Sequence, residues 1–386
     1  MLIGNARVVT PDRVLAPGWV SVSGERIDAV GTGAEPGSRR ASERNFVDLG
    51  GRCLLPGFVD QHVHGGGGAS CTGGDPEEAM RMVAFHRERG TTSTLASLIT
   101  APLSELLSAI SSLADLADDG HIAGIHLEGP FLAAKRCGAQ NPAHLLEPDR
   151  HALSRMIAAG RGHVRMVTIA PEPPGALDLV RDVVDAGAVA AVGHTDATYD
   201  EAAAAFDAGA TVATHLFNGM RPLQHRDPGV VGAALDRESA VCEVIPDGIH
   251  LHEATLRLVV RAVGAARVAG VTDAMVAAGA GDGSYRLGEL SVTVKDGAAL
   301  LDGGDGSLAG STLDTGTALR RVLEFGLSIG EAVALLAGTP ARVLGIDDTC
   351  GAIAPHLRAD FVVCEADGTV AAVMCRGRWT ARERVT

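Results

Sequence analysis

The most informative stretch of the sequence is LLPGFVDQHVHGGGG, an apolar, strand-like run that ends in two histidines and a glycine-rich turn. The histidines are His62 and His64, two positions apart. Side chains of a strand alternate between its two faces, so both imidazoles are expected on one face, together with Asp60. Nitrogen ligands side by side at a strand end are typical of a metal site, which needs further ligands from elsewhere in the chain.

Polar residues also stand at the ends of other apolar runs, within the segments GIHLEGPF, AVGHTD, ATHLFNGM and AGVTDAM. They are Glu128, His194, His215 and Asp273. A single histidine is more often structural than a ligand. Four histidines and two carboxylates at strand ends are much harder to assign to chance. Imidazole and carboxylate together bind a divalent metal such as Zn²⁺ and leave a position open for water.

These residues require a scaffold that brings the ends of many strands together. In the middle of the chain, β-like runs alternate with helical stretches, and the runs end near His64, Ile99, Glu128, Pro171, His194, His215, His250 and Asp273. Eight strand–helix units predict a (β/α)₈ TIM barrel, whose active site lies at the C-terminal ends of the strands. A doubly wound sheet is the alternative, but no GxGxxG motif opens this segment.

The two ends of the chain instead contain short strand-like runs, with a hairpin predicted around Asp367-Gly368. We expect residues 1–52 and 346–386 to form one small discontinuous β domain around a barrel of residues 53–345. Residues 276–312 are predicted to be an insertion that follows the eighth strand.

Composition narrows the possible partners. The formal net charge of -14 argues against a nucleic-acid binder, which needs basic surface, although a small anion could still be held locally. The seven cysteines are scattered and form no CxxC pair, which favours a reducing cytoplasm over a disulfide framework. Neither a signal-peptide pattern nor a long apolar run is evident, so we expect a cytoplasmic protein without a membrane partner.

The chain resembles the amidohydrolase superfamily, and more narrowly the N-acetylglucosamine-6-phosphate deacetylases, in segments that occur in the same order. These are PGFVDQHVHG, HLEGPF, GHTDATY, THLFNGM, PDGIH, VTDAM and LAGSTL. HLEGPF followed by THLFNGM is specific to these deacetylases, whereas HVH alone indicates only the superfamily. The resemblance covers nearly the whole chain and implies a β-sandwich built from both termini.

The resemblance implies a role for each predicted ligand. Glu128, His194 and His215 resemble the ligands of a main metal. His62 and His64 resemble the pair that holds a second metal, with Glu128 as the bridge. Members without this pair use one metal, so two are implied here, and the alternative is a second site that stays empty or weak. The implied metal is Zn²⁺, with Fe, Co, Mn or Cd as other possibilities.

Asp273 resembles the catalytic acid/base of the family. It would take a proton from the metal-activated water and return it to the departing amine. The alternative is that Asp273 is one more metal ligand. Only two lysines occur, Lys135 and Lys295, and neither stands at a predicted strand end. Amidohydrolases that bridge two metals through a carbamylated lysine, such as hydantoinases and dihydroorotases, therefore fit poorly.

The resemblance also implies residues that bind the substrate, namely Ala139, Gln140, Asn218, Gly219, Arg226, His250, Leu308, Ala309 and Gly310. Arg226 and His250 match positions that bind a sugar phosphate, which suits guanidinium and imidazolium donors. A surface ion pair and a structural histidine are the alternatives. In the family one of these groups can come from the neighbouring subunit, which implies a homodimer.

Two residues of the loop AAKRCGAQNP are unusual. Gln140 stands where many members carry histidine; it could still hydrogen-bond a sugar hydroxyl, but it cannot carry charge. Cys137 is either a transient metal ligand or redox sensor, or an ordinary loop cysteine.

The expected activity is hydrolysis of N-acetylglucosamine 6-phosphate to glucosamine 6-phosphate and acetate. A deacetylase for another amino-sugar phosphate, such as the galactosamine epimer, is the nearest alternative. A nucleobase deaminase would leave Arg226 and His250 without a purpose. A non-catalytic assembly protein would not be expected to retain every ligand.

Overall fold

The computed structural model describes residues 1–33, 46–303 and 306–380. The chain divides into two compact units. The terminal unit comprises Met1–Asp60, His86–Ser93 and Thr315–Thr386, and the barrel unit comprises Gln61–Phe85 and Thr94–Asp314. The domain boundaries expected at residues 52 and 345 stay a prediction.

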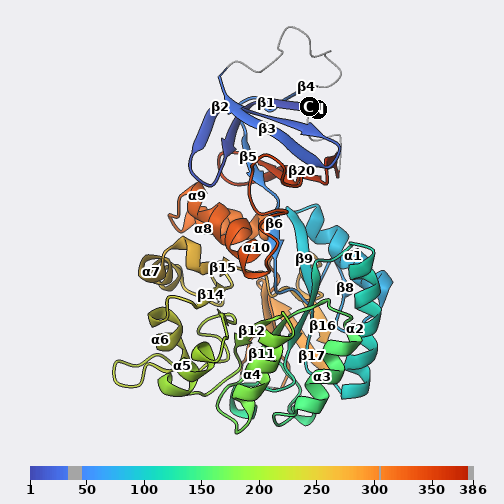
Figure 1. Cartoon of the computed structure of the whole chain (residues 1–386), viewed down its shortest axis with the longest axis vertical. Helices are drawn as coiled ribbons and strands as arrows, with labels where there is room; N and C mark the ends of the chain where they lie inside the picture. Colours follow the sequence, from blue (N-terminus) through green and yellow to red (C-terminus); the bar gives the residue numbers. More distant parts are fainter. Residues whose placement is uncertain (34–45, 304–305, 381–386) are drawn as a thin grey trace. The chain divides into compact units, whose positions relative to one another are not determined.

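The terminal unit contains an eight-stranded sheet built from both ends of the chain (Figure 1). Its strands are β1 (Leu2–Val9), β2 (Val14–Ser23), β3 (Arg26–Thr32), β4 (Phe46–Asp48), β5 (Cys53–Pro56), β19 (Phe361–Cys364), β20 (Val370–Cys375) and β21 (Arg378–Trp379). The order is β21-β20-β19-β5-β1-β2-β3, and β4 pairs with β1. Strands β19 and β20 are antiparallel, so the predicted hairpin at Asp367-Gly368 is confirmed. Ile3, Leu54 and Phe361 are part of its core.

Eight further strands form the barrel sheet, in the order β15-β14-β13-β12-β11-β10-β9-β6. They are β6 (Phe58–Asp60), β9 (Thr91–Leu98), β10 (Gly124–Glu128), β11 (Val164–Ile169), β12 (Val189–Val192), β13 (Val212–Ala213), β14 (Val241–Val244) and β15 (Val268–Gly270). From β9 to β15 every neighbouring pair is parallel and follows chain order. A doubly wound sheet would reverse its order at a switch point, so the predicted TIM barrel is confirmed.

Helices alternate with these strands. They are α1 (Pro76–Arg87), α2 (Leu103–Asp118), α3 (Arg150–Ala159), α4 (Ala176–Asp185), α5 (Tyr199–Asp207), α6 (Gly229–Asp236), α7 (Glu253–Val263), α8 (Thr315–Glu324), α9 (Ile329–Val333) and α10 (Thr339–Val343). Helix α4 buries Ala176, Leu179, Val180 and Val183, the spacing of one apolar helical face. Strand β9 is buried along its whole length, as expected for a strand covered on both faces. Among the described residues, no helix combines the length and apolarity needed to cross a membrane.

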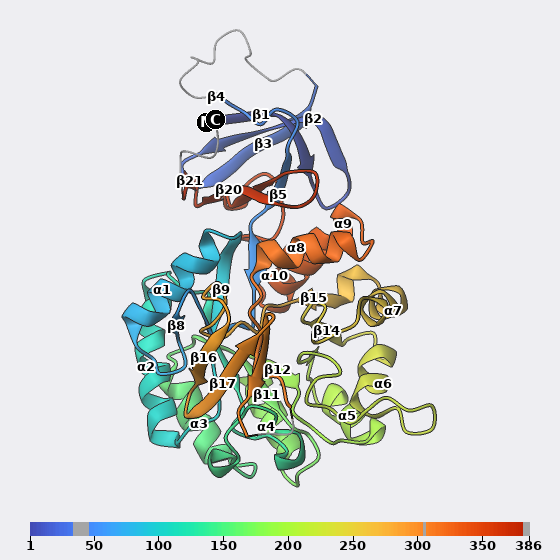
Figure 2. The same ribbon diagram turned by 180° about the vertical axis from the view of Figure 1, so that it is seen from behind.

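The predicted insertion after the eighth strand forms a small antiparallel sheet, drawn in orange in Figure 2. Its strands are β16 (Gly283–Leu287), β17 (Leu290–Lys295) and β18 (Ala298–Leu301). Leu287 and Val292 of this sheet belong to a buried cluster that also contains Ala139 and Met275. The insertion therefore packs against loops that carry predicted substrate-binding and catalytic residues.

One predicted strand end is wrong. The seventh barrel strand, β14, ends at Val244, six residues before His250. Pro246 cannot donate a hydrogen bond to a neighbouring strand. The Asp247 carboxylate then accepts hydrogen bonds from the backbone N–H groups of Ile249 and His250, both at 2.8 Å, which folds this segment into a turn. His250 therefore lies on a loop beyond the strand.

Candidate metal centre

The predicted ligands follow the C-terminal ends of five barrel strands. Glu128 is the last residue of β10, whereas His194, His215 and Asp273 lie two or three residues beyond β12, β13 and β15. At these three residues φ is 48°, 30° and 48°, a left-handed conformation that is uncommon outside glycine. Such backbone strain persists only where the surrounding structure enforces it, and strained residues are concentrated at functional sites.

Glu128, His194 and His215 form the main cluster. The Glu128 Oε1 atom lies 3.0 Å from His194 Nε2 and 3.1 Å from His215 Nε2. The two Nε2 atoms are 3.1 Å apart. All three side chains are buried and offer ligand atoms within 4.8 Å of one another.

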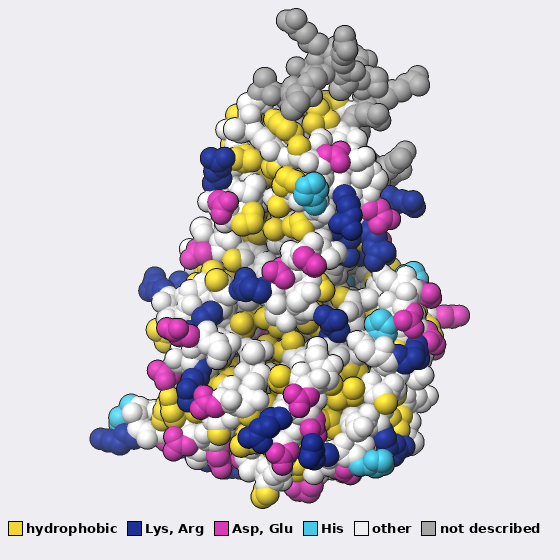
Figure 3. Space-filling model, in the orientation of Figure 1, with side chains coloured by type: hydrophobic (Ala, Val, Ile, Leu, Met, Phe, Trp, Pro, Cys, Tyr) yellow, Lys and Arg dark blue, Asp and Glu magenta, His cyan; other side chains and the backbone are white. Residues whose placement is uncertain are grey.

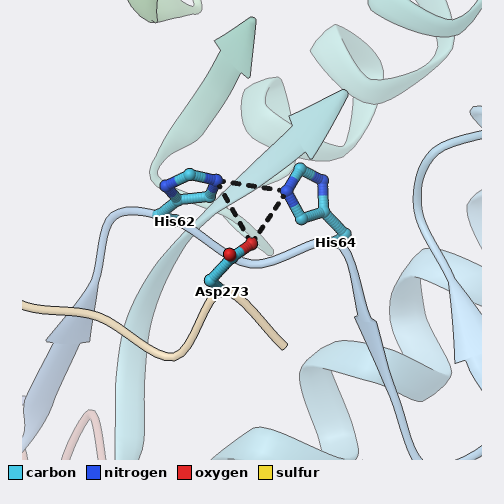
Figure 4. A group of neighbouring side chains, drawn as sticks. All are labelled: His62, His64 and Asp273. Atoms are coloured by element: carbon cyan, nitrogen blue, oxygen red, sulfur yellow. Dashed lines mark hydrogen bonds and ion pairs between the residues drawn. The ribbon is translucent and has the colours of Figure 1, made fainter. Parts of the chain in front are cut away.

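His62, His64 and Asp273 form the second cluster, and their side chains point toward one another in Figure 4. The two histidine Nε2 atoms are 3.1 Å apart, and Asp273 Oδ1 lies 3.2 Å from that of His64 and 3.5 Å from that of His62. Glu128 lies between the clusters, because its Oε2 is 3.3 Å from His64 Nε2. Its Oε1, which contacts His194 and His215, also lies 3.4 Å from His62 Nε2, so the predicted bridge contacts histidines of both clusters.

Each of the four histidines uses its outer nitrogen for a hydrogen bond. Three of them bond backbone carbonyls through Nδ1: His64 that of Ser97 (3.0 Å), His194 that of Arg136 (2.9 Å) and His215 that of Asn218 (3.1 Å). The fourth, His62, bonds the Glu243 carboxylate through Nδ1 (3.1 Å). Carbonyl and carboxylate oxygens only accept, so Nδ1 carries a proton, and Nε2, when it is unprotonated, presents its lone pair inward. Lone pairs this close repel one another unless a cation lies among them, and the donor set therefore fits a divalent metal.

The electrostatics of the centre also favour a cation. Burial opposes the charged form of His64, but the Asp273 and Glu128 carboxylates outweigh it and raise its pKa to about 9. Burial likewise disfavours ionised Glu128, yet His62 and His194 bring the pKa of this carboxyl well below its usual range. The carboxylates that attract a proton here also attract a metal ion.

A cavity of about 390 Å³ opens above both clusters. Its lining includes seven of the predicted substrate-binding residues, namely Ala139, Gln140, Asn218, Gly219, His250, Leu308 and Gly310. Ala309 is fully buried and Arg226 is exposed, so the structure does not bring these two into the lining. At Gly310, where φ is 66°, a Cβ atom would lie 2.9 Å from the carbonyl oxygen of Asp273, so only glycine allows this close approach.

Gln140 lies deep in the cavity wall, with only 4% of its surface exposed. Its Oε1 accepts a hydrogen bond from the backbone N–H of Thr100 (2.7 Å), and its Nε2 donates to Glu128 Oε2 (2.7 Å). Because a backbone N–H can only donate, the amide orientation is fixed. The Oε1 and Nε2 atoms of Gln140, which were expected to face a sugar, are thus both hydrogen-bonded to other groups of the protein.

Sequence reasoning missed several residues of the site. Lys135 and Arg136 line the cavity, where both contact Asp196. Glu243 is fully buried behind the histidines. A charged residue within the apolar run VCEVI was a signal that could have identified it, because an isolated buried carboxylate is rare. Cys137 is half-buried, and burial raises the pKa of its thiol.

On the face that Figure 3 shows, acidic and basic side chains of the described residues are mixed rather than gathered by sign. The centre described above is formed by buried side chains instead.

Comparison with known proteins relates this site to characterised ones. Residues 53–380 match the model of the Amidohydrolase family. The chain is 35% identical to an N-acetylglucosamine-6-phosphate deacetylase of Bacillus subtilis, over 98% of this chain and 96% of the relative. It is also 35% identical to an N-acetylgalactosamine-6-phosphate deacetylase of Escherichia coli O157:H7, over 94% and 95%. A solved mutant deacetylase of Mycobacterium smegmatis in complex with N-acetyl-D-glucosamine-6-phosphate superposes with a TM-score of 0.94 at 44% identity, over 99% of both chains.

Proposed function

The chain belongs to the amidohydrolase family, and on that basis we propose that it is an N-acetylglucosamine-6-phosphate deacetylase, a hydrolase of the acetamide bond. The observation that carries this proposal is the convergence of six buried residues, five proposed metal ligands and Asp273, from five strand ends beneath one cavity. The products are glucosamine 6-phosphate and acetate.

Glu128, His194 and His215 are proposed to hold the main metal, and His62 and His64 the second. A divalent metal, when bound there, would supply Lewis acidity, since it would lower the pKa of bound water toward about 7 and polarise the carbonyl. Four imidazoles with carboxylates suit Zn²⁺, with Fe, Co, Mn or Cd as alternatives. Metal analysis of protein purified without chelators tests this assignment, and the absence of stoichiometric divalent metal would refute it.

Asp273 is proposed to be the acid/base. Burial raises the pKa of its carboxyl, but the lowering by His62 and His64 outweighs this effect, so the group is ionised at neutral pH. An ionised carboxylate facing the cavity can accept a proton as water adds to the acetamide carbon. It then returns that proton to the sugar nitrogen as the C–N bond breaks, and the products are an amine and acetate.

The phosphate is proposed to bind to His250 and Arg226. His250 lines the cavity, and its Nδ1 lies 2.7 Å from the Asp247 carboxylate, which orients the ring; in the imidazolium form its Nε2–H can donate to an anion. Arg226 is exposed on a loop outside the lining of its own cavity. This position supports its delivery to the cavity of a neighbouring subunit, and hence a homodimer.

The two epimers are both candidate substrates, because relatives named for glucosamine and for galactosamine match at the same identity of 35%. Acetate release from the two epimeric 6-phosphates separates them, and faster turnover of the galactosamine form would reassign the substrate. A cytoplasmic location is also proposed, since all seven cysteines are free and suit a reducing compartment.

Acetate release from N-acetylglucosamine 6-phosphate and from the unphosphorylated sugar tests the phosphate assignment. We expect a strong preference for the phosphorylated sugar, and Arg226→Ala should reduce that preference about 10–100-fold, because a hydrogen bond between charged groups contributes about 1.5–3 kcal/mol. Arg181→Ala is the matched control, since Arg181 is exposed on α4 and paired with Asp178. Equal turnover of both sugars by the unmodified protein would exclude phosphate recognition.

A further inference from the structure

A buried carboxylate that is not among the predicted ligands lies behind the metal centre. Glu243 is in the middle of β14 and is fully buried. Removing a carboxylate from water is costly unless hydrogen bonds compensate. Glu243 accepts three: from Gln61 Nε2 at 2.8 Å, from His62 Nδ1 at 3.1 Å, and from the backbone N–H of His215 at 3.2 Å. Two of its three partners therefore belong to predicted metal ligands, one in each cluster.

The bond to His62 differs in kind from those of the other three histidines. His64, His194 and His215 donate their Nδ1 protons to backbone carbonyls, whereas His62 donates to a side-chain carboxylate. A carboxylate is the stronger acceptor and increases the electron density at the opposite ring nitrogen. His62 is thus the one histidine of the four whose ring orientation depends on another side chain.

His62 also occupies a central place in the site. Its Nε2 lies 3.1 Å from His64 Nε2, 3.4 Å from Glu128 Oε1 and 3.5 Å from Asp273 Oδ1. A half-turn of the ring about its Cβ–Cγ bond would place the carbon Cε1 where Nε2 now faces the other ligands. The hydrogen bond to Glu243 opposes this rotation and selects the tautomer with an inward lone pair.

The contact with His215 connects Glu243 to the main cluster through the backbone. His215 has a φ of 30°, which costs free energy and persists only where neighbouring groups enforce it. The Glu243 Oε2 atom that bonds His62 also accepts the His215 N–H, so one oxygen connects the two clusters. The His215 side chain is held independently by the Asn218 carbonyl, which limits the effect of Glu243 on the main metal.

We propose that Glu243 is a positioning residue that sets the affinity of the second metal site by orienting His62. This inference rests on the proposed metal-dependent function. Partners of this kind typically change metal affinity about 10–100-fold. The main site, whose histidines are held by carbonyls, should change much less.

The test is metal binding to the metal-free full chain, with Zn²⁺ alone as the probe and a competing chelator to measure both dissociation constants. We expect two Zn²⁺ ions per chain in the unmodified protein. Glu243→Gln keeps the shape of the side chain and should weaken the second ion about 10–100-fold. An unchanged second dissociation constant in a folded Glu243→Gln protein would overturn the proposal.

Two further variants separate orientation of His62 from general disruption of the buried cluster. Gln61→Met removes another partner of Glu243 without touching His62, and should leave the second dissociation constant within about threefold. In a His62→Ala background, Glu243→Gln should have no further effect on that constant, because the residue through which it acts is gone. Equal weakening by Gln61→Met and Glu243→Gln would assign Glu243 a merely structural role.

A measurement on the unmodified protein keeps the inference testable if Glu243→Gln does not fold. Nitrogen-15 NMR of the His62 ring in the Zn²⁺-loaded protein should show a protonated Nδ1 and an Nε2 that carries no proton. The opposite tautomer would overturn the proposal. Failure of the wild-type chain to bind Zn²⁺ would refute the proposed function itself, whereas wild-type affinity in Glu243→Gln would refute only the role of Glu243.

Discussion

The two clusters of candidate metal ligands contain similar side chains but are held in place differently. In the main cluster, the outer nitrogens of His194 and His215 bond carbonyls of Arg136 and Asn218, residues that also line the substrate cavity. In the second cluster, His64 bonds the carbonyl of Ser97 on β9 and His62 bonds Glu243 on β14. The main cluster is thus tied to substrate-binding loops, and the second to the barrel strands.

This difference separates the roles that the two clusters can take. A shift of one of these loops would move the acceptors of the main cluster directly, so we expect substrate binding to be coupled to the proposed main metal. In the second cluster the histidines bond instead to residues of strands β9 and β14, and this cluster includes Asp273, the proposed acid/base. Glu128 is the residue that both clusters share, because its carboxylate oxygens lie near histidines of both: Oε1 near His194, His215 and His62, and Oε2 near His64.

The largest effect is expected from Glu128→Gln, which removes the shared ligand. A neutral amide is a weak metal ligand, so both sites should lose affinity and the several kcal/mol that a metal contributes to catalysis should be lost. We expect kcat/KM to fall by at least about 10³-fold, which corresponds to roughly 4 kcal/mol. Metal content by mass spectrometry and acetate release measure both effects. Retention of both metals would show that Glu128 is not the bridge.

Asp273→Asn should have the next largest effect, because it removes the proton acceptor and keeps the size of the side chain. General acid–base catalysis contributes about 10²–10⁴-fold, so kcat should fall by that factor with little change in KM. Metal content decides between the two roles considered for Asp273. An acid/base variant keeps both metals, whereas loss of the second metal together with activity would make Asp273 a ligand.

His64→Asn should affect only the second cluster. The main cluster keeps Glu128, His194 and His215, so we expect metal content to fall from two ions to one per chain, with the remaining ion bound as before. The loss of activity should be smaller than that of Glu128→Gln. Metal analysis and acetate release, measured on both variants, check this ranking of the two losses of activity. Loss of both ions from His64→Asn would show that the two clusters do not bind metal independently.

The barrel and the six centre residues could be predicted from the sequence because each left a local signal. Strands such as β12 and β14 are short runs dominated by apolar residues, and polar residues such as Glu128 and His215 stand at or just beyond the strand ends. The hydrogen-bond partners left no such signal. Whether Gln140 faces a sugar or Glu128, and whether Glu243 bonds His62, depends on contacts between residues 12 and 181 positions apart. Sequence spacing carries no information on such contacts.

Gln140 offers the finest test of the comparison, because the sequence and the structure suggest different roles for it. Its Nε2 donates to the Glu128 oxygen that faces His64, so it should support the second metal more than the first. A hydrogen bond to a charged group contributes about 1.5–3 kcal/mol, and much of that is regained if water replaces the amide, so Gln140→Ala should weaken the second metal about tenfold. A sugar contact would instead raise KM and leave metal affinity unchanged. Measuring KM and the dissociation constant of the second metal in Gln140→Ala decides whether Gln140 contacts the sugar or supports Glu128.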